Sequence, residues 1–163
     1  MAEFLSDDQI HALLLEEKLL PADFRRRMKL KPKRGHKESE LDVVGVSGSA
    51  FRLLIRQSLF NPLDFSVILG FCVPGSNQIV RLRRYNGKSH EHTNPIEQQT
   101  FYDFHIHKAT ERYQRSGSRE DTYAEVTDRF VDVEQAIDCL LQDCGFVTPD
   151  DPQQSLFAFG GSR

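Results

Sequence analysis

The sequence contains two His-x-His pairs, which hold four of its six histidines within eighteen residues. The pairs are His90 with His92 and His105 with His107. Alternate residues of a strand point to the same side, so a pair placed on a strand presents two imidazoles on one face. Imidazole binds metal ions and exchanges protons near neutral pH. The two pairs therefore indicate a site, and several kinds of chemistry fit it.

The stretch 101–113 carries the clearest strand pattern around the second pair. Its alternation puts Tyr102, Phe104 and Ile106 on one face and Asp103, His105 and His107 on the other. Because the histidine face lies opposite an apolar face, we expect it to face solvent or a cleft and not the core.

One interpretation is metal-independent cleavage of RNA. RNA supplies its own nucleophile, the 2′-hydroxyl, so two histidines suffice as base and acid, and an arginine stabilises the developing phosphorane charge. The candidate catalytic residues are His92, His105, His107 and Arg81.

Two other interpretations remain open. A divalent metal is one, because His90, His92, Glu97 and His105 resemble the histidine and carboxylate ligand set of cupin barrels. The other is a non-catalytic interaction module, in which the histidines are polar residues of a wet sheet face.

The net charge of −3 hides a strong segregation of charge. Residues 25–37 hold eight Lys or Arg and no acid, whereas residues 120–151 hold ten Asp or Glu against one arginine. Such asymmetry indicates an interaction arm, and basic side chains contact nucleic-acid phosphates. The candidate nucleic-acid-binding residues are Arg25, Arg26, Arg27, Lys29, Lys31, Lys33, Arg34 and Arg83.

The elements that must position these residues follow from hydrophobic periodicity. A helix is predicted over 6–20, with Ser6 and Gln9 as a capping box and Pro21 as its end, and a second helix over 132–144, capped by Asp132. Between them, strands are predicted over 41–46, 51–56, 65–73, 79–85 and 101–113, and a hairpin turn at residues 86–87. Residues 116–127 are predicted to be a loop, and 25–38 an extended or mobile arm.

This order predicts an α+β fold, an antiparallel meander of about five strands with an N-terminal and a C-terminal helix. With 163 residues, of which 39% are hydrophobic and 28% charged, we expect one soluble domain over 1–147 and a loose tail over 148–163. The sequence shows neither a signal peptide nor an apolar run of membrane-spanning length. Three cysteines, an odd number without zinc-type spacing, are expected to be reduced, which suits a cytoplasmic protein.

The stretch from about 51 to 146 resembles small bacterial proteins that include TumE-type toxins, the toxin halves of toxin–antitoxin pairs. The shared features are an arginine-rich strand ending in Tyr-Asn-Gly-Lys at 85–88, a histidine cluster, an aromatic strand, and a final helix over 130–137. The resemblance implies a stand-alone α+β domain that acts on RNA and is neutralised by an antitoxin. This chain is longer, with an additional helix and basic segment in front and a second His-x-His pair. We therefore expect a toxin-like or phage-defence-associated protein that binds or cleaves RNA.

Overall fold

A computed structural model describes residues 4–149 of the chain. The predicted tail lies outside this part, apart from its first two residues. The elements in chain order are α1 (Asp7–Leu15), β1 (Lys18–Leu19), α2 (Phe24–Arg27), β2 (Lys31–Pro32), β3 (His36–Val44), β4 (Ala50–Ser58), β5 (Phe65–Cys72), β6 (Ile79–Asn86), β7 (His92–Asn94), β8 (Gln99–Phe101), β9 (His105–Lys108), α3 (Glu111–Arg115), β10 (Ala124–Val126), α4 (Val133–Asp143) and β11 (Phe146–Val147).

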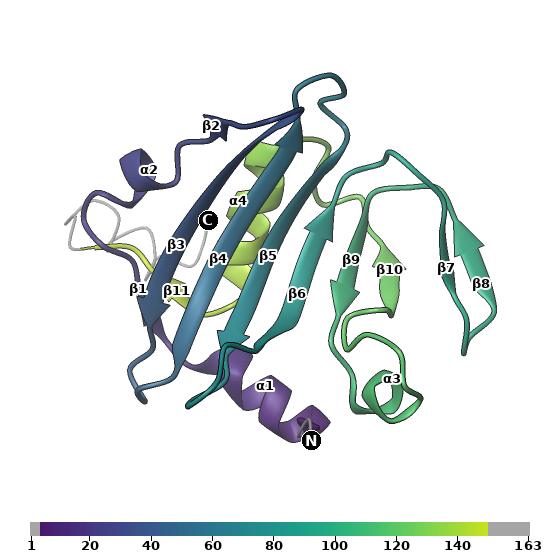
Figure 1. The fold of residues 1–163 in the computed structure, drawn as a ribbon, viewed down its shortest axis with the longest axis horizontal. Coiled ribbons are helices and arrows are strands. Elements are labelled where there is room, and N and C mark those ends of the chain that lie inside the picture. Colours follow the sequence, from purple (N-terminus) through teal and green to yellow (C-terminus); the bar gives the residue numbers. More distant parts are fainter. Residues whose placement is uncertain (1–3, 150–163) are drawn as a thin grey trace.

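The predicted α+β class and antiparallel meander are confirmed. The main sheet has seven strands in the order β10-β9-β6-β5-β4-β3-β2, and every neighbouring pair is antiparallel. The meander is interrupted once, because the small hairpin β7–β8 is inserted between β6 and β9. Figure 1 shows this hairpin beside β9 and β10, at one end of the sheet.

The core lies between the sheet and α4, which crosses one face of the sheet (Figure 1). Along β4 and β5 alternate residues are buried, so one side of each strand faces the core. Helix α4 contributes Ala136 and Leu140, and Cys144 follows as its C-cap; all three are fully buried. Its N-cap is Asp132, whose carboxylate accepts a hydrogen bond from the Gln135 backbone N–H at 2.8 Å. Among residues 4–149, no helix is long and apolar enough to span a membrane.

The first helix is shorter than predicted, ending at Leu15 and not near Pro21. The capping box of Ser6 and Gln9 is present. At the other end the chain turns so that the Lys18 ammonium, fully buried, donates to the carbonyls of Leu13, Leu14, Glu16 and Cys144 at 2.7–3.3 Å. Lys18 thus caps the C-terminal ends of both α1 and α4, a role that side-chain periodicity does not reveal.

Three further predictions about the elements are wrong. The stretch 101–113 is not one strand but β8, β9 and α3, and the predicted loop over 116–127 contains β10. The Asn86-Gly87 pair does not close a hairpin, since β6 pairs next with β9. Gly87 is needed for close packing instead, because a Cβ there would lie 1.9 Å from the Leu63 carbonyl oxygen.

Candidate metal centre

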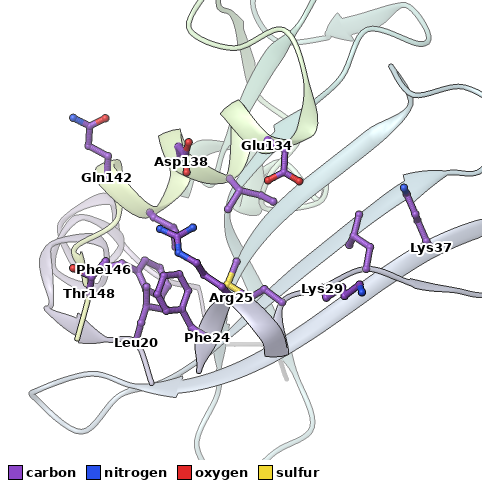
Figure 2. A pocket seen from close by; sticks show the side chains of 14 residues that line it. Leu20, Phe24, Arg25, Lys29, Lys37, Glu134, Asp138, Gln142, Phe146 and Thr148 are labelled. Carbon is purple, nitrogen blue, oxygen red and sulfur yellow. The ribbon is translucent and has the colours of Figure 1, made fainter. Parts of the chain in front are cut away.

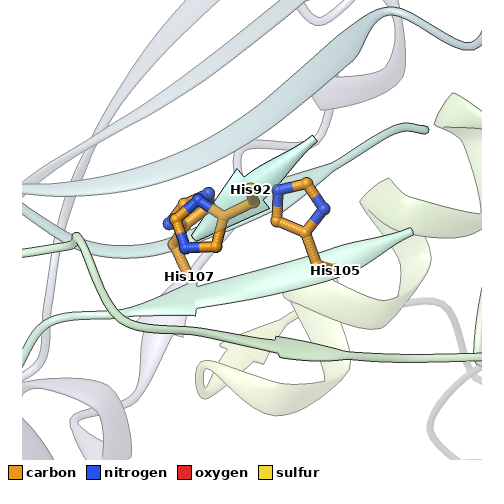
Figure 3. Close-up of side chains that lie close together, drawn as sticks. All are labelled: His92, His105 and His107. Atoms are coloured by element: carbon orange, nitrogen blue, oxygen red, sulfur yellow. The ribbon is translucent and has the colours of Figure 1, made fainter. Parts of the chain in front are cut away.

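Three histidines from two elements converge in the space between β9 and the β7–β8 hairpin (Figure 3). His92 begins β7, and His105 and His107 lie on β9. One ligand atom from each imidazole lies within 4.8 Å of the other two. The ring centroids are 4.8–5.5 Å apart. We call His92, His105 and His107 the histidine cluster.

Strand geometry accounts for the contribution of β9. His105 and His107 share one face of the strand and Ile106 takes the other, as the alternation predicts. The Ile106 face belongs to the main core with α4, so the histidine cluster lies on the opposite face of the sheet.

The expectation that these histidines face solvent or an open cleft is wrong. His105 is 1% exposed and His107 is 3% exposed, while His92 is partly buried. The β7–β8 hairpin covers these histidines. Its Phe101 ring packs against the rings of His92 and His105, with ring centroids 5.4 and 5.5 Å apart. A polar residue enclosed in this way needs a partner, because burying an unpaired polar group is costly.

Two sets of contacts fix the hairpin over β9. Asn94 is fully buried and bridges to β10, where its amide donates to the Ala124 carbonyl at 2.7 Å and its oxygen accepts from the Ala124 N–H at 2.9 Å. At the hairpin turn, the Glu97 carboxylate accepts from the Tyr113 hydroxyl at 2.5 Å and from the Arg112 guanidinium. The strand of His92 is therefore held at its last residue, Asn94, and at the following turn by groups distant in sequence.

The hydrogen bonds of β9 fix the tautomers of its histidines. His105 Nδ1 lies 2.7 Å from the Asp103 carbonyl oxygen, and His107 Nδ1 lies 2.7 Å from the Asp121 carbonyl oxygen. A carbonyl only accepts, so both Nδ1 atoms carry the proton and both Nε2 atoms carry a lone pair. His105 Nε2 is buried and has no hydrogen-bond partner within residues 4–149.

The tautomer of His92 follows from Asn94. The backbone of Ala124 accepts from the Asn94 amide and donates to its oxygen, so the orientation of this side chain is fixed. His92 Nε2 lies 2.8 Å from that oxygen and must donate to it. The lone pair of His92 is consequently on Nδ1, and each member of the histidine cluster has one nitrogen available as an acceptor or a metal ligand.

Burial keeps the two β9 imidazoles neutral. Desolvation lowers the pKa of His105 to about 4, against the hydrogen bond to the Asp103 carbonyl, which raises it, and the Arg84 guanidinium acts in the lowering direction. Desolvation also lowers the pKa of His107 to about 2, and the Arg84 guanidinium opposite it on β6 acts in the same direction. A neutral imidazole with its second nitrogen donating to a carbonyl is the form that binds metal ions.

No protein-family model, curated protein or solved structure matches the chain. The resemblance to TumE-type toxins therefore stays a prediction.

The other residues predicted for a metal or for catalysis lie around the cluster and not in it. His90 is exposed, with Nδ1 3.1 Å from the Ser89 hydroxyl, and Glu97 is used at the hairpin turn. Arg81 lies 3.6 Å from the Asp121 carboxylate, which also pairs with Arg84. No carboxylate joins the three imidazoles within the part of the chain that the structure describes.

The basic segment does not join this site. Strand β2 forms the edge of the sheet opposite β9 and β10, and α2 precedes it in the chain. The segment predicted to be an extended or mobile arm carries two short elements, since Arg25–Arg27 belong to α2 and Lys31–Pro32 pair with β3. Arg83 does not join the histidine cluster either. It lies on the other face of the sheet, the one that carries Tyr85 and packs against α4.

Part of the basic segment instead lines a groove of about 650 Å³ against α4 (Figure 2). Phe24 and Met28 meet Ile137 and Leu141 on its apolar floor. Arg25, Lys29 and Lys37 line it on one side, with Glu134 and Asp138 of α4 on the other. The predicted nucleic-acid-binding residues and the histidine cluster thus lie at two separate places.

Two residues that matter at the site were not predicted from the sequence: Asn94 and Asp121. Asn94 follows His92 by two residues, which places both on one side of a strand, and this spacing is the only sequence signal for it. The contacts of Asn94 with Ala124 and of His107 with Asp121 depend on the tertiary fold.

Proposed function

We propose that the protein is a metalloprotein that holds one divalent transition-metal ion through His92 Nδ1, His105 Nε2 and His107 Nε2. The buried, partnerless Nε2 of His105 carries this proposal, since it lies beside two other imidazoles whose tautomers leave lone pairs. A metal ion satisfies all three lone pairs at once.

The size and donor set of the cluster fit such an ion. Zinc–imidazole bonds of about 2.0–2.1 Å separate tetrahedral ligand atoms by roughly 3.3 Å. One ring nitrogen of each imidazole lies within 4.8 Å of a ring nitrogen of the other two, so side-chain movements can bring the ligand atoms to that separation. Three nitrogen ligands without a carboxylate suit zinc, cobalt, nickel, copper or iron better than magnesium or calcium.

The reaction class this centre fits is hydrolysis. Three protein ligands on a tetrahedral ion leave one position for water, and zinc lowers the pKa of bound water to about 7. Metal-independent cleavage with His105 and His107 as base and acid is less well supported, because the acid step needs an imidazolium. Desolvation lowers the pKa of both His105 and His107 far below neutrality, so neither is charged at pH 7. RNA cleavage that uses these two histidines would then depend on the metal.

Metal titration of the chelator-treated protein tests the proposal. We expect one Zn²⁺ or Co²⁺ per chain, and a loss of affinity of at least about 100-fold in His105→Gln, which removes one of three ligands. His11→Gln is the matched control, because His11 is exposed on α1. Failure of the folded wild-type protein to bind either metal, or equal affinity in His105→Gln, would refute the metal centre.

A further inference from the structure

Strand β6 runs antiparallel to β9 and places two nitrogen donors beside the histidine cluster. Arg84 is the register partner of His107, and Asn86 is the register partner of His105. Residues directly opposite in neighbouring strands share a face and have Cβ atoms about 4.5–5.5 Å apart. Arg84 and Asn86 therefore lie on the histidine face of the sheet.

Asn86 has an amide nitrogen that no residue within 4–149 uses. The side chain is 4% exposed, and its oxygen accepts a hydrogen bond from the Ser66 hydroxyl at 2.9 Å. Because the oxygen is held by Ser66, the N–H₂ group is the part of this amide that can donate to a ligand.

Arg84 is held in a comparable way. Its Nε donates to the Asp121 carboxylate at 2.9 Å, and neither terminal amino group donates a hydrogen bond within the described part of the chain. Asp121 is fully buried, and its backbone carbonyl accepts from His107 Nδ1. One residue thus orients both His107 and Arg84 and fixes their relative positions.

The charges at this place favour an anion. Arg81, Arg84 and Arg119 all lie within 4 Å of the single Asp121 carboxylate, and Glu120 is the second acid nearby. Three arginines against two carboxylates leave a positive excess, to which a divalent ion in the histidine cluster adds two charges. Arginine also presents paired N–H groups that match the oxygens of phosphate.

We infer that the centre binds a phosphate group, with one oxygen on the metal, one on the Arg84 guanidinium and one on the Asn86 amide. A tetrahedral phosphate has enough oxygens to reach all three groups, whereas a carboxylate has two. This inference rests on the proposed metal centre and names its substrate class, a phosphate ester. In such an ester Arg84 and Asn86 would orient the phosphorus beside a metal that supplies an activated water in a shell expanded to five ligands. The P–O bond to that water would form as the ester P–O bond breaks, and the alcohol would leave with a proton.

The test uses Co²⁺-loaded full-length protein and inorganic phosphate as the probe. Phosphate binding at the metal should change the visible absorption of the Co²⁺ ion, and acetate at equal concentration should change it far less. Arg84→Met should weaken phosphate binding by roughly 10- to 100-fold, the effect of a charge-assisted hydrogen bond. Arg84→Lys, which keeps the charge without the paired donors, should fall between Arg84→Met and wild type.

Arg83→Met is the matched control, since Arg83 is adjacent in sequence but lies on the other face of the sheet. It should bind Co²⁺ and phosphate as the wild type does. The Co²⁺ spectrum before phosphate is added also reports whether a variant is folded with its three imidazoles in place.

The outcomes separate the two proposals. If Co²⁺ does not bind, the metal centre fails and the phosphate site fails with it. If Co²⁺ binds but millimolar phosphate leaves the spectrum of the wild type unchanged, the metal centre stands and the phosphate site is refuted. Equal phosphate affinity in Arg84→Met, Arg83→Met and wild type would also refute it.

Discussion

The metal-free protein should lose stability as the pH falls from 8 to 5, because His105 and His107 resist protonation in the folded state. Burial lowers the pKa of His105 to about 4 and that of His107 to about 2, against 6.5 for an ordinary histidine. Below pH 6.5 the unfolded chain therefore binds protons that the folded chain does not, and each such proton favours unfolding. The stabilisation that the two neutral imidazoles provide is fully present above pH 6.5 and declines as the pH falls. For each residue the decline levels off once the pH is below the pKa of that residue in the folded protein.

The size of this loss in stability follows from the difference between pH 5 and the pKa of histidine in the unfolded chain. At pH 5 each unfolded histidine lies about 1.5 pH units below its pKa, and each unit corresponds to about 1.36 kcal/mol. Both folded imidazoles are still largely neutral at this pH, so together they account for a loss of about 4 kcal/mol in the free energy of unfolding. In urea this loss corresponds to a midpoint roughly 2 M lower, for a slope near 2 kcal/mol/M.

Urea denaturation in the presence of a chelator, at pH 8, 6 and 5, measures this loss. The double variant His105→Gln/His107→Gln has no titrating group at these positions and should lose about 4 kcal/mol less than wild type over the same range. The carboxylates titrate alike in both proteins, so the difference between them isolates the two imidazoles. If the free energy of unfolding depends on pH in the same way in the wild type and the double variant, the burial of neutral histidines is refuted.

Two other substitutions test the contacts that hold the site and the fold. Lys18→Met removes the ammonium that caps α1 and α4 and leaves buried carbonyls unpaired, so it should lower the free energy of unfolding by about 2–4 kcal/mol in thermal denaturation, whereas Lys29→Met in the basic segment should change it little. An unchanged melting temperature for Lys18→Met would contradict this role. Asn94→Ala releases His92 from its orienting bond and should weaken Zn²⁺ binding by roughly 10- to 100-fold in a titration, with Thr93→Ala, an exposed neighbour, as control. Equal metal affinity in these two variants would show that Asn94 does not orient a ligand.

The sequence was sufficient to predict the sheet and the final helix, because their signals are local. Alternation over β4 and the apolar run of β5 reflect burial in the sheet, and Asp132 caps α4 within three residues. The alternation around Ile106 also correctly placed His105 and His107 on one side of β9.

The cover over those histidines was not predictable in the same way. Strands β7 and β8 have three residues each, too few for a periodic pattern, and the hairpin is fixed through Asn94 to a backbone 30 residues away. Because the sequence does not reveal that contact, a polar strand face is predicted to face solvent. The first helix was predicted to run on to Pro21 because no side-chain pattern marks its end at Leu15. The cap there is Lys18, a residue type that is normally exposed and is buried here.

X-ray absorption at the zinc edge of the metal-loaded protein tests the histidine ligand set, because it reports the ligand atoms themselves. We expect one Zn²⁺ per chain with three imidazole nitrogens at about 2.0–2.1 Å and one oxygen at a similar distance. Replacing His107 with glutamine should remove one imidazole from this shell, while His11→Gln should leave it unchanged. A shell that contains sulfur at about 2.3 Å, or only oxygen ligands, would contradict a metal centre built from His92, His105 and His107.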